Sequence, residues 1–129
     1  MNPLENLNER HVLLVDDEAS NIYALSSYLE SKQMQVTVAR NGQEVMALLH
    51  TGMQPDVILL DMMMPVMDGY ETLVAMKQEN LLDKIPVIAV TARAMKGDKE
   101  KCLEAGAWDY VSKPVDLALL LTKISTHVS

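Results

Sequence analysis

Three short apolar runs, each ending abruptly at a polar residue, constrain the fold of this chain most strongly. They occupy residues 12–15, 57–60 and 87–90 and consist almost entirely of valine, isoleucine and leucine. Because every position in each run is apolar, both faces of each run must be covered. Strands of a parallel sheet with helices on both faces have this pattern. We therefore predict that the three runs are the central strands of such a sheet.

Two other segments have the pattern of half-exposed strands at the sheet edges. Residues 35–39 (QVTVA) alternate polar and apolar side chains, and residues 108–112 read WDYVS. Between the strands, apolar residues recur at helical spacing, and glycines fall at the expected boundaries. Residues 96–105 are the expected fourth helix, although this segment is charged and weakly apolar. The apolar positions of the other four helices are Ile22, Leu25, Leu29, then Val45, Leu48, Leu49, then Leu73, Met76, and last Leu117, Leu120, Leu121, Ile124.

Five strands alternating with five helices in 129 residues predict one doubly wound α/β domain. Right-handed crossovers favour a flavodoxin-like (βα)5 fold, a five-stranded parallel sheet in the order 2-1-3-4-5 with helices on both faces. The chain is 49% hydrophobic and 22% charged, as is typical of a globular domain with an apolar core. Its length leaves room for a single core, so we expect any output function to reside in partners.

Charge and cysteine content exclude several classes of function. Eleven basic and 18 acidic residues give a net charge of −7, which argues against a protein that binds nucleic acid directly. Cys102 cannot form an internal disulfide, and we expect an unreactive thiol in a reducing, cytoplasmic setting. His11, His50 and His127 lack metal-ligand spacing and are expected to be ordinary surface or boundary residues. The polar N-terminus and the short aliphatic stretches predict neither a targeting segment nor a membrane span.

The polar residues that follow the strands should gather at the edge of the sheet where α/β proteins bind ligands. Aspartates so close together would repel one another unless a cation neutralises them, and carboxylates without thiols or imidazoles suit Mg²⁺ or Mn²⁺. A lysine and a threonine beside them suit phosphoryl oxygens, and a carboxylate can attack phosphorus to form an aspartyl phosphate. This makes Asp61 the candidate nucleophile. The residues are Asp16, Asp17 and Glu18 after the first strand, Asp61 after the third, Thr91 after the fourth and Lys113 after the fifth.

Each of these residues also has an ordinary structural explanation when it is taken alone. An Asp-Asp pair after a strand is a common helix cap, and Asp61 could introduce a turn. Thr91 and Tyr110 could be satisfied strand residues, and Lys113 could be a surface ammonium. The combination of the acids with Lys113 favours a functional site. Four neighbouring methionines could suggest soft copper ligands, but packing in the core and loop explains them better: Met62, Met63, Met64 and Met67.

Four motifs resemble those of the receiver domains of two-component response regulators and hybrid histidine kinases. In order, they are VLLVDDE at 12–18, VILLDMMMPVMDG at 57–69, VIAVTA at 87–92 and YVSKP at 110–114. The resemblance begins near Arg10, so residues 1–9 are expected to be an N-terminal extension and residues 10–129 the receiver domain. Asn21 and the stretch 91–114 look more like receivers attached to hybrid histidine kinases, which implies a larger parent chain.

The resemblance implies a role for each matching acid. Asp61 corresponds to the phosphoacceptor of the family. Asp16 and Asp17 correspond to the acidic pair that holds Mg²⁺ together with Asp61. Met63 corresponds to the position whose backbone carbonyl completes the metal site, and Lys113 to the lysine that stabilises the transferred group.

The resemblance also assigns conformational roles. Thr91 and Tyr110 correspond to the two switch residues, the second of which moves inward when the first turns toward the phosphoryl group. Lys113-Pro114 corresponds to a cis peptide bond. The side chains of Met63 and Arg93 occupy positions that tune the lifetime of the phosphorylated state in this family.

Together these assignments imply transfer of a phosphoryl group from a phosphohistidine of a histidine kinase or histidine phosphotransfer domain to Asp61. The transfer would switch a partner surface around residues 95–125. Only self-phosphorylation and self-dephosphorylation are implied, so we expect no enzyme in the usual sense.

Three alternatives are less well supported. A phosphohydrolase of the haloacid dehalogenase type needs Asp-x-Asp and a cap domain, whereas this chain has Asp16-Asp17-Glu18 and no length for a cap. Flavin binding is disfavoured because no Ser/Thr/Gly-rich phosphate loop follows the first strand. A degenerate receiver that acts only as a binding module is disfavoured, because the acids, the hydroxyl and the lysine are all present.

Overall fold

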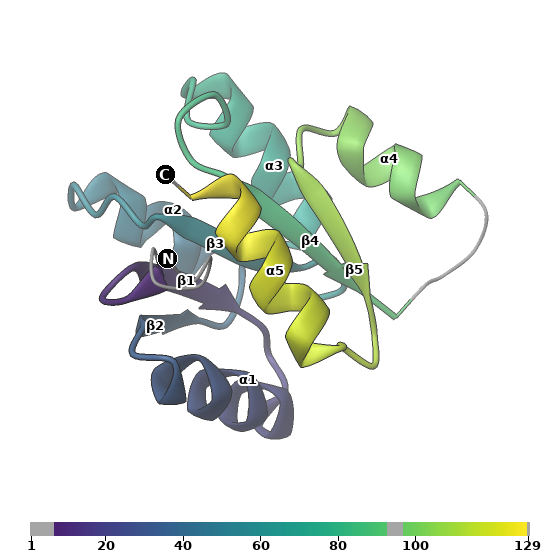
Figure 1. The fold of residues 1–129 in the computed structure, drawn as a ribbon. Coiled ribbons are helices and arrows are strands. Elements are labelled where there is room, and N and C mark those ends of the chain that lie inside the picture. Colours follow the sequence, from purple (N-terminus) through teal and green to yellow (C-terminus); the bar gives the residue numbers. More distant parts are fainter. Residues whose placement is uncertain (1–6, 93–96, 129) are drawn as a thin grey trace.

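The apolar runs of the sequence are strands of one parallel sheet. The computed structural model describes residues 7–92 and 97–128, and strands and helices alternate along this part of the chain (Figure 1). The strands lie in the order β2-β1-β3-β4-β5, and every neighbouring pair is parallel, so the predicted topology is confirmed. The elements are β1 (His11–Val15), α1 (Ala19–Ser31), β2 (Gln35–Ala39), α2 (Gly42–His50), β3 (Val57–Asp61), α3 (Gly69–Gln78), β4 (Val87–Thr91), α4 (Asp98–Glu104), β5 (Asp109–Ser112) and α5 (Leu117–His127).

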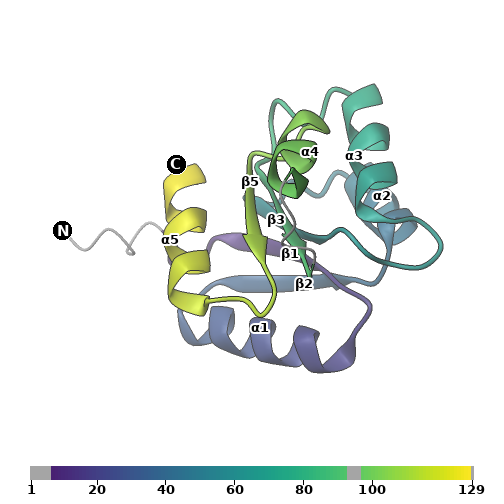
Figure 2. The same cartoon turned by 90° about the vertical axis from the view of Figure 1, so that its right-hand side faces the viewer.

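The alternation of side chains along each strand divides the core into two layers. Along β1, Leu13 and Val15 face a layer that is completed by α2, α3 and α4, while Val12 and Leu14 face a layer completed by α1 and α5. Figure 2 shows α1 and α5 on one side of the sheet and the other three helices on the opposite side. The three central strands are buried along nearly their whole length, whereas β2 and most of β5 are partly exposed, as expected for the two edges.

Local sequence signals set the ends of the helices. Asn41 caps α2 by accepting the N–H of Glu44, and Asp68 forms a capping box with Glu71 at the start of α3. The helix expected at residues 96–105 is shorter, and it follows Gly97 at a positive φ of 97°. The segment between β3 and α3 is held near the carboxyl end of the sheet by the hydrogen bond from the Met62 N–H to the Val90 carbonyl, and the predicted site residues lie at this end.

Most of the methionines expected to pack do so. Met62 is buried, and Met64 and Met67 pack against the same core layer, whereas the Met63 side chain is half exposed. Cys102 is also buried, and burial raises the pKa of its thiol, which is consistent with the expectation of an unreactive cysteine.

The histidines pair with polar side chains in the structure. His11 lies 2.6 Å from the Thr37 hydroxyl, His50 lies 2.8 Å from Glu79, and the His127 ring lies 2.9 Å from Asp109. Within residues 7–92 and 97–128, no helix combines the length and apolar character needed to cross a membrane.

Candidate functional site

The first part of the site is the turn that leads from β1 into α1. Asp16 is 2% exposed, and its backbone N–H donates to the carbonyl of Ala39 at 3.1 Å. One carboxylate oxygen, Oδ1, accepts the N–H of Glu18 at 2.9 Å, which tightens the turn. Asp17 is exposed at the rim. The turn therefore directs the Asp16 carboxylate inward, along the carboxyl end of the sheet.

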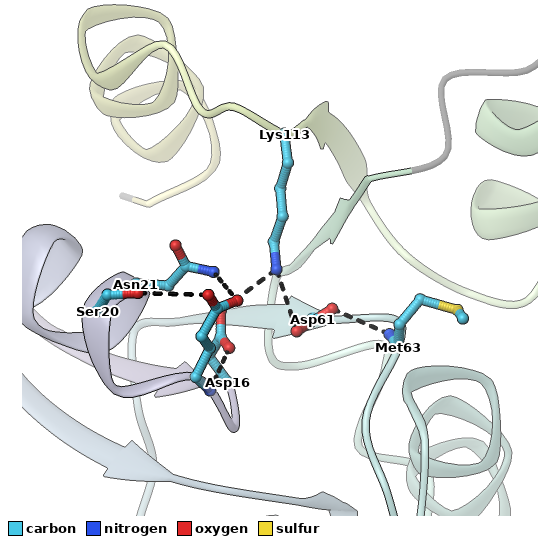
Figure 3. Close-up of polar contacts among 7 residues, drawn as sticks. Asp16, Ser20, Asn21, Asp61, Met63 and Lys113 are labelled. Carbon is cyan, nitrogen blue, oxygen red and sulfur yellow. Dashed lines mark hydrogen bonds and ion pairs between the residues drawn. The ribbon is translucent and has the colours of Figure 1, made fainter.

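The second part is Asp61, the last residue of β3, which pairs directly with β1. It is 3% exposed, and Oδ1 accepts the backbone N–H of Met63 at 2.9 Å. Burial between two apolar strands explains why an acid here requires partners. Figure 3 shows the Asp61 carboxylate between the Met63 backbone on one side and the Lys113 side chain on the other.

Lys113 supplies the cation. It follows β5, its backbone N–H donates to the Thr91 carbonyl at 2.8 Å, and its bond to Pro114 is cis, as predicted. The side-chain Nζ lies 3.2 Å from Oδ2 of Asp61 and 3.5 Å from Oδ2 of Asp16 (Figure 3). One ammonium thus bridges the two buried carboxylates, although the three residues come from three different strand ends.

The surroundings of Asp61 and of Lys113 raise the pKa of both side chains. Burial raises the pKa of Asp61 above its usual value, the charge of Asp16 adds to this, and the hydrogen bond from Met63 and the ammonium of Lys113 only partly oppose it. For Lys113, burial lowers the pKa, but the two carboxylates outweigh burial and raise it overall. The lysine therefore remains a full positive charge at neutral pH, beside a carboxylate that is costly to bury.

The arrangement of carboxylates fits a hard divalent cation. Asp16, Asp17 and Asp61 each offer one oxygen, and these oxygens lie within 4.8 Å of one another. An octahedral Mg²⁺ with bonds of about 2.1 Å holds its ligands roughly 3 to 4.2 Å apart, which is close to this spacing. Oxygen ligands without thiols or imidazoles are also the set that Mg²⁺ and Mn²⁺ prefer.

Glu18, the third acid in the sequence run, turns away from this group. Its carboxylate accepts the side-chain hydrogen bonds of Ser20 at 3.3 Å and Asn21 at 3.1 Å, in the first turn of α1. The sequence placed Glu18 with the strand-end acids, because a run of three acids has no local signal that says which of them faces inward. The hydrogen bonds from Ser20 and Asn21 hold the Glu18 carboxylate at the start of α1.

The predicted switch residues lie next to the site. Thr91, at the end of β4, is 4% exposed, and its carbonyl holds the backbone of Lys113. Tyr110 lies on β5 beside Ala89 of β4 and packs, half buried, against the layer that contains α4. Burial raises the pKa of the Tyr110 phenol. Arg93 lies outside the described residues.

An apolar groove of about 200 Å³ adjoins Lys113, and the sequence did not predict it. It is lined by one side of α1, including Asn21 and Leu25, and by the segment from Pro114 to Leu117 that leads into α5. The only sequence signal was the apolar spacing of the two helices, which does not show that they pack on the same face of the sheet. The groove gives the acidic pocket a hydrophobic border.

Comparison with known proteins agrees with this geometry. The family profile described as "Response regulator receiver domain" matches residues 12–125. The chain is 37% identical over 123 residues, 91% of its length, to the "Hybrid signal transduction histidine kinase I" of Dictyostelium discoideum, of which it spans 7%. It is 34% identical to the "Polar-differentiation response regulator DivK" of Brucella anthropi, with 92% of this chain and 96% of DivK covered. Two further curated relatives are much longer than this chain, which spans 25% of one and 28% of the other.

Solved structures show the same likeness. The receiver domain of the Francisella response regulator 1452 superposes with a TM-score of 0.84 at 30% identity, covering 91% of this chain and 94% of that one. The profile match covers most of the chain, and its ends enclose all of the acids, the threonine and the lysine described above. This chain therefore belongs to the response regulator receiver domain family of two-component signalling.

Proposed function

We propose that Asp61 accepts a phosphoryl group from a phosphohistidine on a histidine kinase or histidine phosphotransfer domain. In this step an oxygen of the Asp61 carboxylate bonds to phosphorus as the bond between phosphorus and the imidazole nitrogen breaks. The electron pair of that bond leaves with the imidazole. The observation that carries the proposal is the contact of the Lys113 ammonium with both Asp61 and Asp16, beside a cluster of three acids.

Each residue has a distinct task in this proposal. Asp16, Asp17, Asp61 and the backbone carbonyl of Met63 would hold Mg²⁺, which would neutralise charge on the phosphoryl oxygens when bound. Met63 orients the acceptor through its N–H, which fixes Oδ1 of Asp61. Lys113, already 3.2 Å from Oδ2, needs only a small movement to contact an oxygen of the incoming group.

The site also suggests how the donor approaches and how the product is reported. The apolar groove beside Lys113 could receive an apolar surface of the donor domain, which would place its histidine at the mouth of the pocket. After transfer, the Thr91 hydroxyl would turn toward the phosphoryl group and Tyr110 would move inward. The surface of α4, β5 and α5, within residues 95–125, would then bind the next partner; Met95 lies outside the described residues.

The wider setting follows from the same reasoning. The chemistry is confined to phosphorylation and dephosphorylation of the domain itself, so we do not class it as an enzyme. The match to a segment of a hybrid kinase supports a larger parent chain. A cytoplasmic location suits both a phosphohistidine donor and the single, buried Cys102.

Intact-mass analysis with Mg²⁺ and acetyl phosphate tests the proposal. We expect one added phosphoryl group in the wild type, and none in Asp61→Asn or in excess EDTA. Asp83→Asn, which makes the same chemical change at an exposed position, should be phosphorylated normally. An Asp61→Asn protein that is phosphorylated at the wild-type rate would refute the assignment. Repeated turnover of p-nitrophenyl phosphate would instead favour a phosphohydrolase.

A further inference from the structure

A second concave site lies at the opposite end of the sheet. Its volume is about 470 Å³, and it is lined by residues that precede four strands: Arg10 before β1, Asp56 before β3, Pro86 before β4 and Trp108 before β5. The aspartate pocket lies where the strands end. Because the strands contain four or five residues, the two sites are separated by roughly 15 Å of sheet.

Part of the lining of this cavity is apolar and held in place. Ile85 and Pro86, both buried, belong to this part. The indole N–H of Trp108 donates to the carbonyl of Leu82 at 2.8 Å, and the ring meets the His127 ring edge-on, with 6.0 Å between centroids. Trp108 is nevertheless 40% exposed. The cavity therefore offers an aromatic surface whose orientation is fixed before any ligand arrives.

The charges around the cavity differ from those of the whole chain. The protein carries a net charge of −7, yet the titratable groups that line this cavity are Arg10, Lys84 and His127 against one carboxylate, Asp56. Asp56 accepts the N–H of His11 at 2.7 Å and pairs with Arg10 at 3.3 Å, and His127 pairs with Asp109 at 2.9 Å. Lys84 is exposed at the rim. Lys84 is thus the lining cation that these two ion pairs leave available to an anionic ligand.

We propose that this cavity binds a small amphipathic anion, with an aromatic or aliphatic body against Trp108, Ile85 and Pro86 and an acidic group near Lys84. Its volume lies in the range of small-molecule sites. The site does not use the residues of the aspartate pocket, so the proposal stands apart from the phosphotransfer function. It gives the domain a place where a metabolite could be sensed.

Titration of the whole chain with 2-naphthoate, followed by ¹H–¹⁵N correlation spectra, tests the proposal. The sequence contains one tryptophan, so its indole N–H gives a single resonance that reports on the cavity. We expect saturable shifts of this resonance and of the backbone amides of residues 52–54, 56, 81–85 and 127–128. The neutral analogue 2-naphthamide should bind at least tenfold more weakly.

Two charge reversals at exposed lysines complete the test. Lys84→Glu places an acid at the rim, while Lys77→Glu makes the same change on α3, at a residue that does not line the cavity. We expect Lys84→Glu to weaken naphthoate binding at least tenfold and Lys77→Glu to leave it within twofold. The proposal is overturned by any of three results: no saturable shift, shifts that map outside the cavity, or equal binding of acid and amide or of both variants.

Discussion

Replacing the phosphoacceptor by its neutral isostere should stabilise the metal-free domain. In Asp61→Asn the side-chain carbonyl can still accept the Met63 N–H, but the charge is removed. At an effective dielectric constant of 20, the lost attraction to Lys113 at 3.2 Å is about 5 kcal/mol. The relieved repulsion from Asp16, with oxygens up to 4.8 Å apart, is about 3.5 kcal/mol by the same arithmetic.

The cost of burying the charge decides whether Asp61→Asn is more or less stable than the wild type. Desolvation of a buried ion costs several kcal/mol, which exceeds the difference of about 1.5 kcal/mol between those two Coulomb energies. The raised pKa of Asp61 has the same origin, because burial outweighs Lys113 there too. Lys113 also keeps Asp16 at 3.5 Å, so the substitution does not leave the ammonium without a partner. We expect Asp61→Asn to raise the free energy of unfolding by about 1 to 2 kcal/mol.

The stabilisation should depend on pH in a defined direction. Because the pKa of Asp61 is raised in the folded state, the wild type loses stability as the pH rises from the ordinary value of 3.8 through the folded-state pKa. In Asp61→Asn the side chain at this position does not titrate, so it makes no such contribution. The variant's advantage should therefore be complete above the folded-state pKa of the wild-type Asp61 and should shrink on acidification, as that carboxyl becomes protonated.

Urea denaturation followed by circular dichroism in EDTA measures this difference. Asp83→Asn is the matched control at an exposed position, and its stability should stay within about 0.5 kcal/mol of the wild type. Mg²⁺ should then stabilise the wild type by mass action and have a much smaller effect on Asp61→Asn. An Asp61→Asn protein that is less stable than the wild type at pH 7 in EDTA would show that the attraction to Lys113 exceeds the cost of burial.

Three further substitutions test other parts of the fold by the same denaturation assay. Gly42→Ala should destabilise by about 1 to 3 kcal/mol, because its Cβ would collide with the Thr72 hydroxyl where α2 meets α3; an unchanged midpoint would contradict this close packing. Val66→Asn should stabilise by about 1 kcal/mol, since valine sits at a φ of 70°, and a loss of stability would show that this backbone is not strained. Burial raises the pKa of Asp109, but hydrogen bonds, first that from Lys123, outweigh burial and lower it overall. Asp109→Asn should therefore cost about 1 kcal/mol at pH 7, and the difference should vanish as the pH falls from 3.8 through the lowered pKa; a difference that persists in acid would contradict the ionic origin.

Much of the architecture is determined by local features of the sequence. The apolar runs identify the central strands because burial on both faces requires apolar side chains at every position, and this requirement holds for each segment separately. Asn41 and Asp68 likewise mark helix starts by bonds to residues three positions away. The residues of the site could be named for the same reason, since parallel strands end at one edge of the sheet.

Only the tertiary structure decided which of those residues touch. Lys113 lies 52 residues from Asp61 along the chain, and its contact with both buried acids depends on how β5 is placed against β4 and β3. Glu18 is adjacent in sequence to Asp17, yet its hydrogen bonds to α1 remove it from the cluster. The cavity at the end of the sheet where the strands begin has no motif, because it is formed where loops from distant segments meet around Trp108. Secondary structure follows from neighbours a few residues apart, whereas distances between side chains and the shape of cavities depend on how the packed layers come together.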